Sequence, residues 1–284
     1  MKPPSALTLG WRTDLNFVRF DGELIERGDC IVVRTPANPT YWWGNFLLFD
    51  QAPQAGDAAE WSRRFEAEIA CHQSESRHTT FGVDAREAFV LPDDFIERGF
   101  SLYASNVLTM RREQLRAPRR VLPSNFRVAA LKLPAQTPEA VALQLRCDAG
   151  EHQPVDGYRL FRQRQMARYE SMARQRRGDW FGVFAHSANG EQIVADCGLF
   201  HAGPGGDALG RFQHVETDPS FRRRGLCSAL IHAVCLDAFE RLHLHTLVIV
   251  ADPLDVAIGL YESLGFERGA GSWHIERRPA EAAP

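Results

Sequence analysis

The chain has 284 residues, 44% of them hydrophobic and 24% charged, and its net charge is −3. These values are typical of a folded globular protein with one large domain or two smaller ones. Because there is no basic excess, we expect neither nucleic acid nor a membrane surface as a partner. The first residues lack the apolar run of a signal peptide, and no apolar run approaches the roughly 20 residues that span a bilayer.

The N-terminal half predicts a small α/β domain. Residues 1–16 look like a loose lead-in, and the domain itself is expected at 17–112. Apolar runs and helical spacing predict strands and helices in the order strand, strand, helix, strand, helix, strand, at 29–34, 41–50, 58–70, 79–83, 92–98 and 100–110. The charged, proline-containing residues that follow predict a solvated linker at 113–124.

The C-terminal half, residues 125–280, predicts a second α/β domain. Its expected strands lie at 126–131, 180–185, 192–200, 210–217, 245–250 and 266–276. Its expected helices lie at 137–147, 157–177, 226–241 and 254–264. Asn189-Gly190 indicates the tight turn of a hairpin, and the glycines at 203–206 predict a flexible loop.

The stretch from His214 to Leu230 carries the clearest functional signal. A turn at Asp218-Pro219 is followed by three arginines, a glycine and a helix that begins near Leu226. The first N–H groups of a helix have no intrahelical acceptor, and the helix dipole is positive at that end. Such a terminus binds phosphate, and glycine lets the backbone approach the ligand closely. The alternative is that these arginines are ordinary solvated charges.

Two segments resemble the GNAT acetyltransferases (GCN5-related N-acetyltransferases). Arg222-x-x-Gly225-x-Cys227 resembles their Q/R-x-x-G-x-G/A acyl-CoA loop, with Cys227 where the family usually has Gly or Ala. The segment 257–266, AIGLYESLGF, is similar to their A-x-x-L-Y-x-x-x-G-F segment. The resemblance covers about 125–278. It implies the GNAT fold, an α/β fold of the α+β type with a mixed central sheet flanked by helices.

The N-terminal half repeats the element order of the core of the second half. Residues 50–56 stand where the arginine-glycine loop would be, and they carry no arginine. We therefore expect a tandem arrangement, in which the first unit is a degenerate GNAT-like domain without a CoA loop. An unrelated small α/β domain is the alternative. The first half would shape the acceptor pocket or take the place of a dimer partner.

The resemblance implies acetyl-CoA as a co-substrate and transfer of its acetyl group to an amine of a small molecule or peptide. In this fold the strands at 210–217 and 245–250 separate, and pantetheine lies between them. The resemblance assigns cofactor binding to Val215, Thr217, Arg222, Arg223, Arg224, Gly225, Leu226, Cys227, Ser228 and Tyr261. Backbone amides from 223 to 228 would hold the pyrophosphate.

Two residues are expected to carry the chemistry. Tyr261 matches the family tyrosine near the CoA sulfur and is the expected general acid; the alternative is a packed tyrosine with a satisfied hydroxyl. Glu216 is the expected general base, unless it only forms an ion pair with an arginine. Rival bases are His214, Asp196 and Asp218. Leu254 replaces the family's asparagine in the last helix, with Asp252 and Asp255 nearby.

The six cysteines are scattered and form no C-x-x-C pair, so we expect reduced thiols, a cytoplasmic protein and no metal. Cys227 lies at a helix N-terminus, which can lower a thiol pKa, but inside a CoA loop we interpret it as a structural residue that is open to oxidation. Two alternatives remain for the function: a non-catalytic regulatory module that binds acyl-CoA, or a transferase that uses another acyl-CoA. The expected assembly is a monomer or a homodimer.

Overall fold

The structure, a computed structural model, describes residues 3–148, 155–188, 190–202 and 208–279. It divides into two compact units. Unit 1 contains the residues up to Val107, residues 251–253 and the residues from Gly269 onward, and unit 2 contains Leu108–Val250 and Leu254–Arg268. The expected turn residue Asn189 and the expected loop at 203–206 lie outside the described residues.

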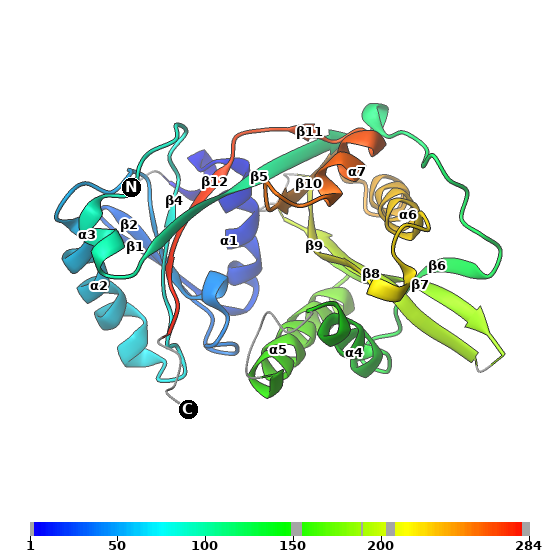
Figure 1. Cartoon of the computed structure of the whole chain (residues 1–284), viewed down its shortest axis with the longest axis horizontal. Coiled ribbons are helices and arrows are strands. Elements are labelled where there is room, and N and C mark those ends of the chain that lie inside the picture. The colour runs from blue at the N-terminus through cyan, green and yellow to red at the C-terminus, as the bar shows by residue number, and fades with distance from the viewer. Residues whose placement is uncertain (1–2, 149–154, 189, 203–207, 280–284) are drawn as a thin grey trace. The chain divides into compact units, whose positions relative to one another are not determined.

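Unit 1 is built on a mixed sheet with the strand order β1-β2-β3-β4-β12-β5 (Figure 1). Its strands are β1 (Glu23–Arg27), β2 (Cys30–Arg34), β3 (Phe46–Phe49), β4 (Thr79–Val83), β5 (Ser101–Arg111) and β12 (Ser272–Arg277). Its helices are α1 (Leu9–Asp21), α2 (Asp57–Glu68) and α3 (Asp93–Glu97). Strands β3 and β4 run parallel, and the other neighbours run antiparallel.

Strands β2, β3 and β4 are buried on both faces of this sheet, which explains why β2 and β3 read as continuous apolar runs. Successive residues of a strand point to opposite faces. Ile31 and Val33 therefore join the core under α1, while Val32 joins the core under α2 and α3. On the α2 side, Trp61 stacks on Phe49 with ring centroids 3.7 Å apart.

Helix α1 corrects the expectation of a loose lead-in at 1–16. Trp11, Leu15 and Val18 recur at i, i+4 and i+7, so they share one face of a helix. All three are at most 3% exposed and pack on the sheet. Strand β4 has glycine at Gly82, where a Cβ would lie 2.7 Å from the Trp11 ring. Burial of a large side chain contributes about 1.5–3 kcal/mol, which stabilises α1.

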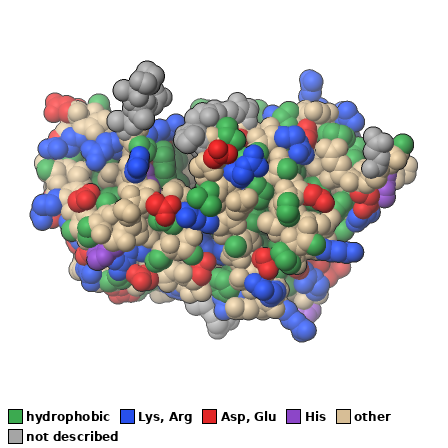
Figure 2. Space-filling view, turned by 90° about the horizontal axis from the view of Figure 1, so that it is seen from below, with side chains coloured by type: hydrophobic (Ala, Val, Ile, Leu, Met, Phe, Trp, Pro, Cys, Tyr) green, Lys and Arg blue, Asp and Glu red, His purple; other side chains and the backbone are tan. Residues whose placement is uncertain are grey.

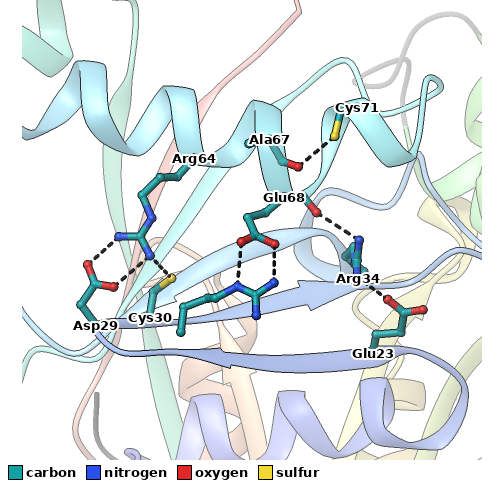
Figure 3. A network of polar contacts seen from close by, with 9 residues as sticks. Glu23, Asp29, Cys30, Arg34, Arg64, Ala67, Glu68 and Cys71 are labelled. Carbon is teal, nitrogen blue, oxygen red and sulfur yellow. Dashed lines mark hydrogen bonds and ion pairs between the residues drawn. The ribbon is translucent and has the colours of Figure 1, made fainter.

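Ion pairs attach helix α2 to β1 and β2 (Figure 3). Arg64 on α2 contacts Asp29 at 2.5 Å, and Arg27 on β1 contacts Glu68 on α2 at 2.7 Å. Arg34 binds Glu23 at 2.8 Å. Exposed pairs of this kind contribute only a few tenths of a kcal/mol each, so they orient α2 more than they stabilise it.

Unit 2 has the strand order β10-β9-β8-β7-β6. Its strands are β6 (Phe126–Ala130), β7 (Gly178–Ser187), β8 (Gly190–His201), β9 (Leu209–Thr217), β10 (Thr246–Ala251) and the short β11 (Glu267–Arg268). Its helices are α4 (Thr137–Cys147), α5 (Val155–Arg174), α6 (Leu226–Glu240) and α7 (Ala257–Leu264). Strands β9 and β10 run parallel, whereas β8 and β9, β7 and β8, and β6 and β7 run antiparallel. The predicted mixed sheet flanked by helices is thereby confirmed.

The expected closing strand at 266–276 is two strands in two units. β11 pairs with the end of β5 inside unit 2, whereas β12 lies between β4 and β5 in unit 1. Glycines at 269 and 271 separate them. Ile275 of β12 is fully buried in the core under α2, so burial holds this strand in unit 1. The structure therefore differs from the expected boundary at 125–280. Among the described residues, none of the helices has the length and apolar character required to cross a membrane.

Candidate functional site

The loop from β9 to α6 presents a row of unused backbone donors. Gly225 caps α6 with φ 82°, and Arg223 also has a positive φ of 63°. In the described part of the chain, the amides from 223 to 228 donate to no protein acceptor, and the first bonded amide is that of Ala229, to the Gly225 carbonyl at 3.1 Å. Six consecutive N–H groups at a helix N-terminus form a site for an anion.

The three arginines of this loop keep their charges available. The Arg222 Nε donates to the Thr217 carbonyl at 3.1 Å, and Arg224 donates to the Ser220 carbonyl at 3.2 Å. Neither these two nor Arg223 forms an ion pair with a carboxylate of the described residues. Because no protein carboxylate neutralises them, an anionic ligand at α6 would meet their full charge.

Strands β9 and β10 separate beside this loop. Their pairing is limited to Leu209–Arg211 against Thr246–Val248. From Phe212 to Thr217, β9 pairs with β8 only, among the described residues. This confirms the expected separation and leaves one backbone edge of β9 from 212 to 217 without a partner strand among the described residues. Val215 and Thr217, the expected pantetheine contacts, both lie on that part of the strand.

A β-bulge bends β9 within its part that is not paired with β10. Two residues, His214 and Val215, lie opposite the single residue Cys197 of β8, and His214 has a φ of 48°. Bulges of this kind increase the local twist and redirect side chains, and they are common next to active sites. The sequence gives no local signal for this bulge, since no glycine, asparagine or proline marks it.

Tyr261 lies on α7 with its ring buried, 6.1 Å from the ring of Phe266. Burial raises the pKa of its hydroxyl well above the usual range, and the neighbouring Cys227 and Asp255 raise it further. The hydroxyl therefore keeps its proton at neutral pH, as a general acid must.

The residues before α7 do not include the family's asparagine. Asp255 accepts the Ala257 N–H at 2.8 Å at the start of α7, and Leu254 is 91% exposed.

Cys227 does not have the lowered pKa that its place at a helix N-terminus suggested. Burial raises the pKa of this thiol to about 12, with a further contribution from Asp255. The dipole of α6 acts in the opposite direction, but desolvation of the thiolate outweighs it. Cys227 is therefore a structural thiol of the loop.

Glu216 and Asp196 form a buried carboxyl pair on strands β9 and β8 of unit 2. The two residues are directly opposed on β9 and β8. Burial, and after it the negative charge of Asp196, raise the pKa of Glu216 to about 8. Asp196 is fully buried, which raises its pKa too, and it accepts the Trp180 Nε1–H at 2.9 Å. The His214 ring lies against the Glu216 carboxyl group. The structure thus brings together three of the four candidate bases.

The fourth candidate for the general base, Asp218, accepts hydrogen bonds from two other groups. It accepts from the Arg146 Nε at 2.9 Å and from the Ser220 N–H at 3.0 Å. Burial by itself would raise the pKa of Asp218, but these two donors hold it below the usual range. A carboxylate that is stabilised in this way is a poor base at neutral pH.

Helix α5 contributes a charged residue that the sequence analysis missed. Arg162 is only 3% exposed and donates to Gln144 at 2.9 Å and to Gln165 at 3.0 Å. Its positive charge opposes the raised pKa of Glu216. Arg162 lies on the same buried stripe of α5 as Met166 and Tyr169. A charged residue at helical spacing from these apolar ones is the sequence pattern that could have identified Arg162 as a buried site residue.

The equivalent loop in unit 1 is closed. Gly56 caps α2 with φ 99°, as Gly225 caps α6. Here, however, Asp94 Oδ2 accepts from the Gly56 N–H at 3.1 Å and from the Ala58 N–H at 3.0 Å. The parallel strands β3 and β4 also stay paired to their ends, at Phe49↔Val83. A carboxylate thus occupies the anion position, and the strands do not separate beside it.

Comparison with known proteins agrees with this geometry. Residues 180–268 match the family described as acetyltransferase (GNAT) domain. A functionally unknown conserved protein from Staphylococcus epidermidis ATCC 12228 is similar at 16% identity and a TM-score of 0.69, over 92% of this chain and 96% of that one. A GCN5-related N-acetyltransferase from Kribbella flavida is similar at 16% identity and a TM-score of 0.63, over 94% and 93%.

A tandem GNAT protein from the clavulanic acid biosynthesis pathway is similar at 12% identity and a TM-score of 0.54, over 84% of this chain and 76% of that one. No curated protein matches the chain. Identities this low show the fold alone. The chain therefore has the GNAT fold in a tandem arrangement, and residues 180–268 form a domain of the GNAT acetyltransferase family.

Proposed function

We propose that the chain is an acetyl-CoA-dependent N-acetyltransferase that acts on an amine of a small molecule or peptide. The observation that carries this proposal is the row of six unused amides at the start of α6, directly beside the separated strands β9 and β10. Both features lie inside the segment that matches the acetyltransferase family. The described residues of unit 1 show neither feature, so we assign the acyl-CoA site to unit 2 alone.

Acetyl-CoA would bind by its backbone-like pantetheine arm and its phosphates. The arm pairs with the free edge of β9 at Val215 and Thr217 and takes the place of a missing strand. The pyrophosphate accepts from the amides of Arg223, Arg224, Gly225, Leu226, Cys227 and Ser228. Oxygen anions at such a site gain from both the N–H groups and the helix dipole.

The reaction would proceed by direct attack in a ternary complex. The amine loses a proton to Glu216, directly or through water, and its nitrogen attacks the thioester carbonyl. A C–N bond forms and the C–S bond breaks, and the thiolate leaves with a proton from Tyr261. Alignment of the two reactants supplies most of the rate gain. A base with a pKa near 8 is suited to deprotonate an ammonium group at neutral pH.

Other properties of the chain support a small acceptor and a cytoplasmic location. All six cysteines are free thiols, as is usual in a reducing compartment.

On the face shown in Figure 2, basic side chains are scattered among acidic and apolar ones, whereas a nucleic-acid surface would gather them. A monomer or homodimer stays our prediction for the assembly.

A screen of primary amines with acetyl-CoA, read out by thiol release, tests the proposal. We expect at least one acceptor to be turned over by the wild type. Tyr261→Phe and Glu216→Gln should still bind acetyl-CoA but should turn over the same acceptor much more slowly. Binding of acetyl-CoA with unchanged thiol release across the screen would instead indicate the non-catalytic regulatory module.

A further inference from the structure

We propose that Arg120 is a specificity residue of the acyl-CoA site. It would hold the loop at 222–228 between β9 and α6, called the phosphate loop below, and would bind the phosphates of the nucleotide. This inference rests on the proposed function. The segment that carries Arg120 was expected to be a solvated linker at 113–124. In the structure it belongs to unit 2 and is docked on it.

The docking begins at the end of α7. The Arg116 N–H donates to the Leu264 carbonyl at 2.9 Å. Gly265, which follows α7 with φ 110°, has no room for a Cβ because the Gln114 carbonyl lies against it. These contacts fix the path of the segment before it reaches α6, so Arg120 arrives at the loop from a fixed direction.

Arg120 then contacts the phosphate loop itself. Its guanidinium donates to the Arg223 carbonyl at 2.8 Å, and a Cβ on Gly225 would lie 3.2 Å from the Arg120 Cβ. In a trans peptide the C=O and the following N–H point in opposite directions. The bond from Arg120 therefore sets the direction of the Arg224 N–H, one of the six unused amides.

The charges around the loop point to a ligand with several negative charges. Arg120 and the arginines at 222–224 form no ion pair with a carboxylate in the described part of the chain. Arg64, by contrast, is neutralised by Asp29 in Figure 3. Four unpaired cations in a chain of net charge −3 repel one another, and a polyanion removes that repulsion. The nucleotide end of CoA carries a pyrophosphate and a ribose phosphate, which match this requirement.

Binding of three ligands by isothermal titration calorimetry tests the proposal. Acetyl-CoA carries both the pyrophosphate and the ribose phosphate, its dephospho form lacks the ribose phosphate, and S-acetylpantetheine lacks the whole nucleotide. Arg120→Ala should weaken acetyl-CoA binding about tenfold, the loss of one charge-assisted hydrogen bond. The matched control is Arg119→Ala, which removes the same charge from the preceding exposed residue, for which the described part of the chain shows no hydrogen bond or ion pair to the loop.

The affinities of the two variants for the three ligands decide whether the proposal holds. A tenfold loss for acetyl-CoA that is absent for S-acetylpantetheine supports the proposal. If Arg120→Ala also weakens binding of the dephospho form, Arg120 acts on the pyrophosphate. If Arg120→Ala binds the dephospho form as tightly as the wild type does, Arg120 acts on the ribose phosphate. Equal affinity of Arg120→Ala and wild type for acetyl-CoA would overturn the proposal while the proposed function stands. An equal loss in Arg119→Ala would also overturn it. No acetyl-CoA binding by the wild type would overturn both.

Discussion

An Asp196→Asn substitution removes one negative charge beside Glu216 and keeps a side-chain oxygen that can accept the Trp180 N–H. We expect it to lower the pKa of Glu216 from about 8. Directly opposed residues on neighbouring strands have Cβ atoms about 5 Å apart. Two carboxylates about 6 Å apart in an effective dielectric of about 20 repel by roughly 3 kcal/mol, which equals about two pKa units. Because burial is the larger cause and remains, the pKa should stay above the ordinary 4.5.

Carbon-13 NMR of glutamate-labelled protein measures this pKa directly. The side-chain carboxyl signal of Glu216 is assigned by its absence in Glu216→Gln and is followed from about pH 4 to about pH 9. Glu139→Gln, on the exposed side of α4, is the matched control and should leave the Glu216 titration unchanged. A wild-type pKa near 4.5, or the same pKa in Asp196→Asn, would refute the role of the carboxyl pair in tuning the base.

Three further predictions follow from the contacts described above. Tyr261→Phe keeps the ring beside Phe266 but removes the proton donor. In a steady-state assay, turnover should therefore fall about 10²- to 10⁴-fold, with an unchanged KM for acetyl-CoA. Turnover equal to that of the wild type would contradict the role of Tyr261 as the general acid. Glu216→Gln should gain stability over the wild type as the pH rises. The raised pKa means that the folded wild type holds a proton that the unfolded chain releases, so its free energy of unfolding falls between about pH 5 and pH 8 by up to about 1.4 kcal/mol per pH unit. Urea unfolding at several pH values measures the difference, and a flat difference would contradict the raised pKa. Asp94→Ala should cost about 1–2 kcal/mol because two amides of α2 lose their acceptor. It should create no second acetyl-CoA site, since β3 and β4 stay paired, and calorimetry that finds two sites would contradict this.

The parts of the structure that are encoded locally could be predicted from the sequence. The turn, glycine and helix after β9 are a continuous segment, and Gly225 has the positive φ that only glycine adopts easily. The separation of β9 and β10 was expected from the family resemblance to that segment and is confirmed. Helix α1 was missed although Trp11, Leu15 and Val18 have helical spacing and Thr8 and Gly22 flank it. The Thr8 side chain does not cap the helix and donates instead to Asp84 just after β4, a contact that exists only in the folded chain.

The parts that depend on tertiary contacts could not be predicted. Asp196 and Glu216 are 20 positions apart, and only the register of β8 against β9 makes them neighbours. The docking of Arg120 on the phosphate loop joins residues 103 positions apart. The placement of β12 in unit 1 depends on which sheet offers Ile275 a buried position, and that is a property of the folded core. Composition alone made the segment at 113–124 look like a solvated linker.

Thermal unfolding with and without acetyl-CoA tests the central claim, that α6 and the separated strands of unit 2 form the acyl-CoA site. A ligand at about 100 times its Kd should stabilise the wild type by about 2.7 kcal/mol. Gly225→Ala and Gly56→Ala place alanine at equivalent helix caps, φ 82° and φ 99°, and both should cost about 1 kcal/mol without ligand. We expect acetyl-CoA to stabilise Gly56→Ala as much as the wild type and Gly225→Ala much less. A wild type that millimolar acetyl-CoA leaves unchanged, or equal stabilisation of both variants, would contradict the account.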